Sequence, residues 1–228
     1  MRGNTEWILV DTETTGLEKP IWALEIAAIR FRGWKRVGEP IQIFLNPQIQ
    51  PAPKAVELHG YDLAFQAKHG MDSTEGYKKL LAFVAGAPVC AHNLKYDYGK
   101  VLQPELARLD LPGLRYGFCT MWLAQRALPH LTSHAQGVIE EAYGITNAKA
   151  HEALSDVLAT ADIIEKVFAP LIQGTSFDDF AEIQELTEQV PPDIAASALR
   201  RAQMRSGKGA ARSAEQEGAS GKREESCT

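Results

Sequence analysis

Apolar residues along this chain form short runs that predict strands and longer patterns that predict helices. The runs predict five strands: one that begins at Trp7, and residues 23–36, 39–45, 88–91 and 114–119. The longer patterns predict helices at residues 73–85, 94–109, 120–127, 134–143 and 152–168. The order of these elements, with three strands first and alternating helices and strands afterwards, predicts an α/β protein.

The connections between the elements predict the layout of the sheet. The second and third strands join near Gly33, so together with the first strand they are expected to form an antiparallel meander. Residues 46–53 form a Pro-rich loop, and His59 and Gly60 lie in a short segment that leads to the first helix. Strands and helices alternate from there, which predicts a mixed sheet with parallel strands flanked by helices.

The composition changes after about Pro170, so a main domain is expected over residues 1–170. A helix start at residues 191–193, followed by apolar residues and three arginines up to Arg205, predicts a helical extension over residues 171–205. Residues 206–228 are mostly small or charged, bury too little apolar surface to fold, and are expected to be disordered. This tail either tethers the protein to a partner or is a solvated terminus.

Composition narrows the class of protein only slightly. The net charge of −5 over 228 residues does not suit a protein that grips long duplexes through phosphate contacts alone. No apolar run approaches the roughly 18 residues of a membrane span. Three cysteines without a CxxC pair argue against a disulfide framework and a zinc site. The first residues lack the apolar stretch of a signal peptide, so a cytoplasmic protein is expected.

Two carboxylates lie at the end of the first strand. Asp11 and Glu13 are two positions apart, and side chains alternate along a strand, so both are expected on one face. Two buried like charges are costly unless a hard divalent cation lies between them. The pair is therefore a candidate metal site, and a solvated strand end followed by a Thr-Thr-Gly turn is the alternative.

Three further positions favour the metal site. Asn93 and Asp97 form an Asn-x-x-x-Asp motif after a strand, and His151 and Asp156 form a His-x-x-x-x-Asp motif at the start of a late helix. With the Asp-x-Glu pair, these motifs resemble the DEDDh family of 3′ to 5′ exonucleases over roughly residues 6–170. That family includes the proofreading epsilon subunit of bacterial DNA polymerase, ribonuclease T and oligoribonuclease. The resemblance implies a ribonuclease-H-like sheet.

The resemblance also implies two Mg²⁺ or Mn²⁺ ions, held by Asp11, Glu13, Asp97 and Asp156. Such a pair of ions supplies a nucleophile at neutral pH and stabilises charge on the entering and leaving oxygens of a phosphodiester. In the family pattern, Asp11 bridges both ions. Glu13 and Asp156 complete one coordination shell, and Asp97 orders the other, partly through water. Oxygen ligands fit hard cations better than zinc or copper.

His151 is the expected general base, because an imidazole titrates near neutral pH. On a continuous helix it would point about 140° away from Asp156, at about 100° per residue, so it is expected on the loop before the helix. A second branch of the family has a tyrosine four residues before the last aspartate. This chain has Glu152 there, which favours the histidine branch. A histidine with no catalytic role is the alternative.

Residues after the acidic pair are expected to contact substrate. By resemblance, the backbone around Thr14 and Gly16 meets the terminal nucleotide, and Leu17 packs against its base. Gly16 suits a close approach or a positive φ, and it is equally an ordinary turn residue. His59 matches a family position that contacts substrate, although Tyr61 stands where the family commonly has a β-branched aliphatic residue.

Asn93 matches the family motif, and by resemblance it is grouped with the residues that are expected to contact substrate. With His92 it is expected either to support the loop before Asp97 by hydrogen bonding or only to cap the turn. Four other polar residues are excluded from the site: His69, His130, His134 and Asp162.

Taken together, these residues predict a metal-dependent 3′ to 5′ exonuclease. It would release nucleoside 5′-monophosphates from a single-stranded or frayed 3′ end, in DNA proofreading or repair. The alternatives are an exoribonuclease, a weakly catalytic subunit that recruits a polymerase, and a related enzyme that cuts internally. A polymerase or a second copy of the chain is the expected protein partner, and a membrane is not. The complete set of four acids and a histidine favours the enzyme.

Overall fold

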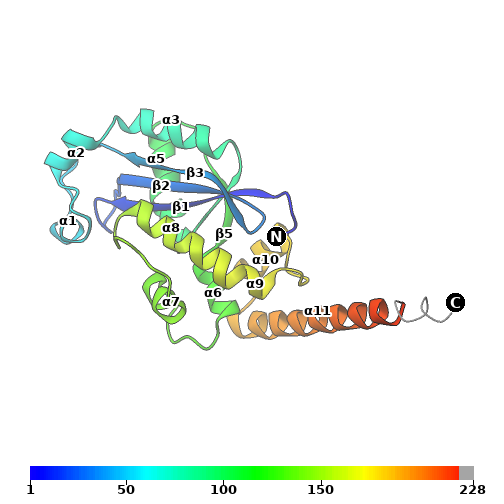
Figure 1. Ribbon diagram of the computed structural model, residues 1–228. Coiled ribbons are helices and arrows are strands. Elements are labelled where there is room, and N and C mark those ends of the chain that lie inside the picture. The colour runs from blue at the N-terminus through cyan, green and yellow to red at the C-terminus, as the bar shows by residue number, and fades with distance from the viewer. Residues whose placement is uncertain (221–228) are drawn as a thin grey trace.

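A five-stranded sheet forms the centre of the computed structural model, with helices on both faces (Figure 1). The structure describes the backbone of residues 1–220 and the side chains of residues 1–207. The strands are β1 (Glu6–Thr14), β2 (Ala23–Arg32), β3 (Lys35–Phe44), β4 (Pro88–Ala91) and β5 (Arg115–Cys119). In the order β3-β2-β1-β4-β5, the first three pair antiparallel, and β4 runs parallel to β1 and β5. The mixed sheet expected from the sequence is confirmed.

Helices follow the meander and alternate with β4 and β5. The helical segments before β5 are α1 (Pro53–His59), α2 (Leu63–His69), α3 (Ser73–Val84), α4 (Leu94–Tyr96), the π-helical η1 (Asp97–Leu102) and α5 (Gln103–Arg108). Those after β5 are α6 (Thr120–Ala127), α7 (Gln136–Tyr143), α8 (Ala153–Ile163), the π-helical η2 (Ile164–Phe168), α9 (Ala169–Ile172), α10 (Phe180–Glu188) and α11 (Pro192–Ser220). Among the described helices, none is long and apolar enough to cross a bilayer.

Alternation of side chains along β1 divides the core into two halves. Trp7 and Leu9 belong to a cluster that includes residues of α6, α8 and α9, whereas Ile8 and Val10 belong to a cluster that includes residues of α3 and α5. Trp7 is fully buried and stacks on Phe31 of β2 at a centroid distance of 4.3 Å. Burying an apolar side chain completely contributes about 1.5–3 kcal/mol, so the sheet is held from both sides.

The boundaries of the meander differ from the expected ones. The second strand ends at Arg32 instead of residue 36, because Gly33 adopts a φ of 58° and turns the chain there. The third strand accordingly begins at Lys35, before the expected residue 39. Two short helices, α1 and α2, occupy a region that the sequence predicts as a loop and a connecting segment. Helices of this length leave little periodicity to detect.

The later helices lie where the sequence places them, with changes in their ends and geometry. The helix expected over residues 94–109 is a continuous series of α4, η1 and α5, and the one expected over residues 152–168 is α8 followed by η2. Helix α7 begins at Gln136, not at residue 134. The π-helical turns at η1 and η2 depend on local packing that hydrophobic periodicity does not report.

The C-terminal part packs on the same core and then extends away from it. Ile183 of α10 and Leu199 of α11 belong to the cluster that contains Trp7. Helix α11 does not end at Arg205 but continues to Ser220, beyond the rest of the molecule (Figure 1). Alanine is frequent after Arg205 and has the highest helix propensity, which favours this continuation, and the disorder expected for the tail stays a prediction. The expectation for residues 221–228 lies outside the described residues.

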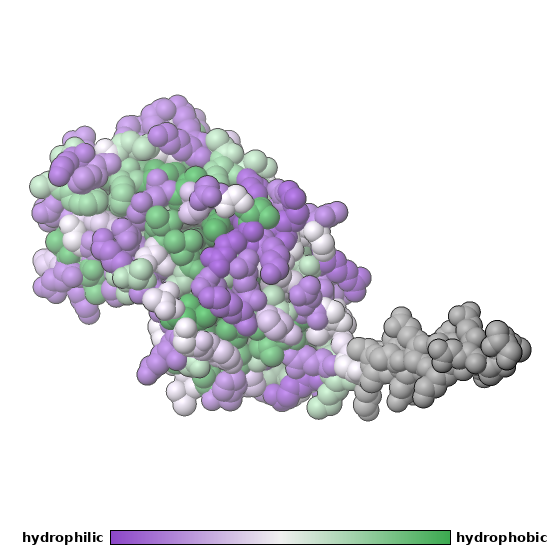
Figure 2. Space-filling model, in the orientation of Figure 1, coloured by the Kyte–Doolittle hydropathy of each residue, from purple (hydrophilic) through white to green (hydrophobic). Residues whose placement is uncertain are grey.

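Most of the face shown in Figure 2 is hydrophilic, with hydrophobic residues in separate patches.

Cys90 and Cys119 are buried as free thiols, and Cys227 lies outside the described part of the chain.

Candidate active site

Strand β1 places Asp11 and Glu13 on one face of the sheet. They continue the row of Trp7 and Leu9, which faces α8, and both are half-buried. A register shift between Glu13 and Thr14 interrupts the pairing with β2 at this point. Such irregularities redirect side chains at strand ends and are frequent beside active sites.

Asp97 reaches the same end of β1 from the neighbouring strand. After β4 the chain turns at Asn93, which has a φ of 72°, and passes through α4 to Asp97 at the start of η1. Asp97 is 3% exposed, and the Thr12 hydroxyl donates a hydrogen bond of 2.7 Å to its Oδ1. Side chains alternate along β1, so Thr12 points to the opposite side from its two acidic neighbours and connects β1 with η1.

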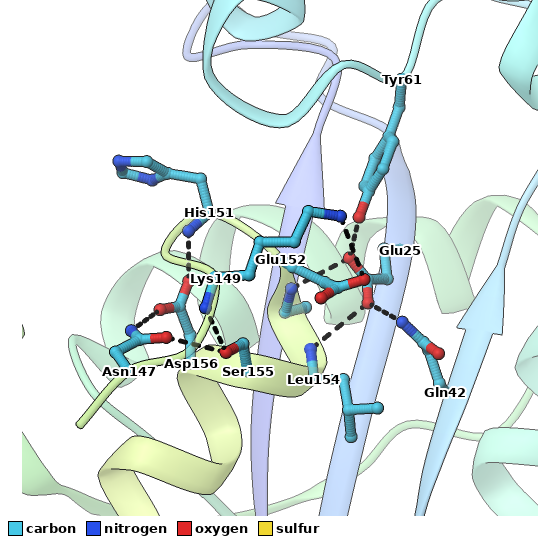
Figure 3. Close-up of polar contacts among 11 residues, drawn as sticks. Glu25, Gln42, Tyr61, Asn147, Lys149, His151, Glu152, Leu154, Ser155 and Asp156 are labelled. Atoms are coloured by element: carbon cyan, nitrogen blue, oxygen red, sulfur yellow. Dashed lines mark hydrogen bonds and ion pairs between the residues drawn. The ribbon is translucent and has the colours of Figure 1, made fainter.

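Asp156 lies in the first turn of α8, where the helix dipole favours a carboxylate. The loop before α8 folds back over it: the Asn147 amide donates to Oδ1 at 2.6 Å, and the His151 backbone N–H donates to Oδ2 at 3.1 Å (Figure 3). On the other side, the Gln136 amide of α7 donates to the Asp156 backbone oxygen at 3.1 Å. The orientation of this carboxylate is therefore set by several neutral donors.

His151 lies in the turn before α8, outside the helix, as the sequence predicts. Its φ is 65° and its side chain is exposed, with the ring pointing away from Asp156 in Figure 3. Even so, one ligand-type atom from each of Glu13, His151 and Asp156 lies within 4.8 Å of the others. Segments that are far apart in the sequence therefore bring these three residues together.

Burial and mutual repulsion raise the pKa values of the acids. Burial, followed by the charges of Asp97, Asp156 and Glu13, raises the pKa of Asp11 well above its usual range. Burial also raises the pKa of Glu13 to about 8, with Asp156 as the largest charge effect. Burial raises the pKa of Asp97 to about 7, although the Thr12 hydrogen bond opposes this.

Asp156 behaves in the same way. Burial raises its pKa, and the hydrogen bond from Asn147 opposes the change. Four acids that each resist ionisation favour a bound cation, and their oxygen atoms fit hard ions such as Mg²⁺ or Mn²⁺. The donor set at this end of β1 is thus suited to a divalent metal.

We expect the stability of the metal-free protein to fall as pH rises from about 4, the ordinary carboxyl pKa, to about 8, the pKa of Glu13. The folded protein holds protons on these carboxyls where the unfolded chain has released them, so deprotonation favours unfolding. Urea unfolding with EDTA between pH 5 and pH 8.5 measures this. The decrease should be about 2–4 kcal/mol larger for the natural protein than for Glu13→Gln. Parallel profiles for the two proteins would contradict it.

A pocket of about 440 Å³ opens beside the acids. One wall is the end of β1 and the turn after it, including Thr14, Gly16 and Leu17, and the opposite wall comes from α1 and its flanks, including Leu58 and His59. Leu17 is 80% exposed and Leu58 is 51% exposed, so two apolar side chains project at its mouth. The lining of the pocket is mainly apolar, and exposed apolar side chains at its mouth mark it as a binding surface.

Hydrogen bonds between distant segments hold the walls of the pocket. The Tyr96 hydroxyl lies 2.9 Å from the Thr14 hydroxyl and donates to the Gly16 carbonyl at 3.2 Å. Gly16 has a φ of 142°, and a Cβ there would lie 3.2 Å from the Ala52 side chain. Only glycine meets both conditions without strain, so the positive φ expected at this position is present, and the contact of Gly16 with substrate stays a prediction.

Both ring nitrogens of His59 are hydrogen-bonded within the protein. Nδ1 accepts from the Tyr61 backbone N–H at 3.0 Å, so Nε2 carries the proton and donates to the Thr14 carbonyl at 3.0 Å. Burial lowers the pKa of His59, which keeps the ring neutral. His59 therefore lines the pocket and supports Thr14, and its expected contact with substrate stays a prediction.

The residues beside the Asn93 turn have different surroundings. Asn93 is exposed, and its left-handed conformation starts α4. His92 is held between the Thr120 hydroxyl at 3.1 Å and the His134 carbonyl at 2.9 Å, and burial lowers its pKa to about 4. His92 thus supports the loop as a neutral ring.

The four residues excluded from the site have other partners. His134 contacts the Leu128 carbonyl, His130 lies near the Tyr143 hydroxyl, His69 packs on Phe65, and Asp162 pairs with Arg36 and Lys166.

An exonuclease family, RNase_T, matches residues 8–164, a range that includes the four acids and His151. The chain belongs to this exonuclease family. Within it, a PolC-type DNA polymerase III from Caldanaerobacter subterraneus subsp. tengcongensis is 26% identical over 190 residues, 83% of this chain but 13% of that protein. The DNA polymerase III subunit epsilon of Pasteurella multocida is 26% identical over 205 residues, 86% of this chain and 76% of the subunit.

Solved structures show that this exonuclease shares its fold with other nucleases. E. coli exonuclease I in complex with a dT13 oligonucleotide has a TM-score of 0.63 at 20% identity, over 73% of this chain and 42% of the other. Exonuclease X in complex with 5′ overhanging duplex DNA has a TM-score of 0.58 at 22% identity, over 79% of this chain and 99% of the other. The ribonuclease-H-like fold expected from the sequence is confirmed.

Sequence reasoning missed several residues of the exonuclease site. Four side chains hold the acids or the pocket through hydrogen bonds: Thr12, Tyr96, Asn147 and Gln136. For Thr12, its position between two acids is a sequence signal that could have indicated this role. Asn147 lies nine residues before the carboxylate that it contacts, in a loop whose path follows no periodic pattern.

Proposed function

We propose that this protein is a metal-dependent 3′ to 5′ exonuclease that removes nucleoside 5′-monophosphates from single-stranded or frayed DNA ends, in proofreading or repair. The observation that carries the proposal is the convergence of four acids with raised pKa values and an exposed histidine beside a pocket of about 440 Å³. Paired carboxylates with a neighbouring base are the arrangement that metal-assisted phosphodiester hydrolysis requires.

Each group has a role in this mechanism. The ions would be held by the oxygen atoms of the four acids, Asp11, Glu13, Asp97 and Asp156. When bound, two divalent cations lower the pKa of water and neutralise charge that develops on the phosphate. The His151 ring would accept a proton from the attacking water, since it is exposed and close to Glu13 and Asp156.

The pocket would hold the terminal nucleotide. Leu17 and Leu58 would pack on the base, and the backbone between Thr14 and Gly16 would face the sugar. The hydrogen bonds of Tyr96 and His59 fix this backbone before substrate arrives, so less ordering is needed on binding. A rigid pocket beside the acids favours cleavage at the end of a strand.

A second groove, of about 370 Å³, lies between the turn after β1 and the η1–α5 segment. Lys19, Lys100 and Arg108 line it. Lys100 lies 5.8 Å from the centre of the Tyr96 ring, and Lys19 follows a residue that lines the first pocket, so the two spaces are neighbours. Cationic side chains here suit the phosphates upstream of the terminal nucleotide, although the whole protein is acidic.

Replacing Lys19 and Lys100 together with alanine should raise KM for a 12-nucleotide single strand about 10-fold and reduce its dependence on salt concentration, because two phosphate contacts are lost. KM and kcat for a dinucleotide, which is too short to reach the groove, should not change. Steady-state kinetics with the two substrates at 50 and 200 mM salt measure these effects. The matched control removes Lys78 and Lys79 of α3, and equal effects of the two double variants would contradict the assignment of the groove.

DNA is the proposed substrate because similar proteins act in DNA synthesis or are bound to DNA. Two relatives are DNA polymerase III proteins, and the two solved structures above contain DNA. A DNA polymerase is accordingly the protein partner that we propose.

The decisive experiment uses 5′-labelled DNA and RNA oligonucleotides of the same sequence, with Mg²⁺, Mn²⁺ or EDTA. A ladder that shortens one nucleotide at a time from the 3′ end of DNA, and disappears with EDTA, is the expected result. Faster shortening of RNA would replace DNA by RNA as the substrate. Internal cutting, or no cutting with either metal, would overturn the proposed function.

A further inference from the structure

A fifth carboxylate, Glu25 of β2, is buried beside the four acids of the site. It pairs directly with Glu13 across the antiparallel register of β1 and β2, so both side chains lie on the face of the sheet that packs against α8. Its exposed fraction is 0%. A fully buried carboxylate needs strong hydrogen-bond partners, and the identity of these partners indicates what Glu25 does.

Four donors converge on Glu25 from three separate segments (Figure 3). Oε1 accepts from the Gln42 amide of β3 at 2.8 Å and from the Leu154 backbone N–H at 3.3 Å. Oε2 accepts from the Tyr61 hydroxyl at 2.7 Å and from the Ala153 backbone N–H at 2.9 Å. A carboxylate offers about four lone-pair positions, so these donors account for them all and leave none for a metal ion.

Two of the donors are the first backbone N–H groups of α8, which have no partner within a helix. The residue that precedes the helix, Glu152, makes no side-chain cap bond. Glu25 therefore caps α8 from another element, and its negative charge lies at the end of the helix where the dipole favours it. The helix start that Glu25 holds is two residues after His151 and three residues before Asp156.

A third donor connects Glu25 with the nucleotide pocket. Tyr61 donates its hydroxyl to Glu25 and its backbone N–H to the His59 ring, and His59 in turn donates to the Thr14 carbonyl. A chain of hydrogen bonds thus runs from the capped end of α8 to the backbone that lines the pocket. One carboxylate fixes both the metal side and the nucleotide side of the site.

We propose that Glu25 is a positioning residue of this exonuclease: it sets α8, and with it Asp156 and His151, against β1, and it holds the Tyr61–His59 segment against the pocket. It does this without binding metal. This inference rests on the proposed function, because it assigns Asp156 and His151 their roles there.

The chain contains a matched control in Glu105 of α5. Glu105 is also buried, at 2% exposure, and it also accepts from a tyrosine hydroxyl, Tyr77 at 2.6 Å, and from a backbone N–H, Ala23 at 2.8 Å. It contacts neither α8 nor the pocket in the described structure, and its charged partner is Arg108 of the second groove, at 3.4 Å. Glu25→Gln and Glu105→Gln therefore remove similar interactions, and only the first disturbs the four acids and His151, so the two variants are compared by their Mn²⁺ affinity.

The first test is Mn²⁺ affinity, measured by electron paramagnetic resonance titration of the full chain together with urea unfolding. Both variants should lose stability. Only Glu25→Gln should weaken Mn²⁺ binding, by about 10- to 100-fold, the range found for residues that orient metal ligands. Saturating Mn²⁺ should restore part of kcat in this variant. Equal Mn²⁺ affinities in the two variants would overturn the proposal.

The second test uses Tyr61→Phe, which keeps the carboxylate and its bonds to α8, with Tyr77→Phe as its control. Tyr61→Phe should raise KM for a single strand at least about 3-fold and leave Mn²⁺ affinity unchanged, and Tyr77→Phe should change neither. If Glu25→Gln does not fold, the comparison of Tyr61→Phe with Tyr77→Phe tests the proposal by itself. Identical kinetics in these two variants would overturn the proposal.

These results differ from those expected if the proposed function is wrong. In that case the unmodified protein itself fails to bind Mn²⁺ or to shorten the strand.

Discussion

Replacing Asp11 with asparagine should abolish exonuclease activity and, at the same time, stabilise the metal-free protein. The substitution keeps the shape of the side chain and removes the charge that interacts with all the other acids of the site. Loss of a ligand that supports several kcal/mol of charge stabilisation corresponds to a decrease of about 10³-fold or more in rate. Removing one buried charge from a repelling group should raise the free energy of unfolding by about 1–3 kcal/mol at pH 8 with EDTA.

On one preparation, gel assays with Mg²⁺ measure activity, calorimetry measures Mn²⁺ binding, and urea unfolding measures stability. Asp162→Asn is the control, because Asp162 lies on the same helix as Asp156 but pairs with Arg36 and Lys166. It should keep activity and Mn²⁺ binding. If Asp11→Asn were fully active, or were less stable than the natural protein at every pH, the assignment of Asp11 to the metal site would be wrong.

Replacing His151 with asparagine should lower kcat by about 10²- to 10⁴-fold, the usual contribution of a general base. Asparagine suits this position because the backbone of residue 151 has a φ of 65°, and asparagine tolerates the left-handed region better than most residues. The backbone N–H that holds Asp156 stays in place. Mn²⁺ affinity should therefore remain within about 3-fold of the natural value, since the ring is not needed as a ligand.

Single-turnover kinetics at saturating Mn²⁺ show whether the ring is the base. The rate of His151→Asn should stay low even when the metal sites are filled, because bound metal does not replace the lost base. His69→Asn on α2 is the control for an exposed histidine far from the acids, and it should behave like the natural protein. A parallel loss of Mn²⁺ binding in His151→Asn would make His151 a ligand instead of a base.

The sheet and the acidic residues could be predicted because their signals are local. Alternation along β1 places Asp11 and Glu13 on one face, and the helix period separates His151 from α8. The motif around Asp97 follows a short apolar strand that is legible by itself. Each of these inferences uses residues within a few positions of one another, where backbone geometry alone decides which way a side chain points.

Glu25, Tyr61 and Asn147 could not be assigned in the same way. Each acts through a partner in another segment: Glu25 contacts α8 across 128 residues of sequence, and Tyr61 contacts Glu25 across 36. Their residue types are common, and nothing in their immediate neighbours differs from an ordinary strand or loop. The short helix α1, which forms a wall of the pocket, has too few residues for a clear period.

The amino-acid sequence by itself determined the five strands, the longer helices and the mixed sheet through periodicity, and it indicated the four acids and the histidine through short motifs that resemble a known family. Only the tertiary structure decided how the acids share one environment, which donors hold them, and where the pocket and the basic groove lie. The physical reason is that pKa values, buried hydrogen bonds and cavities depend on distances between segments that the chain brings together only when it folds.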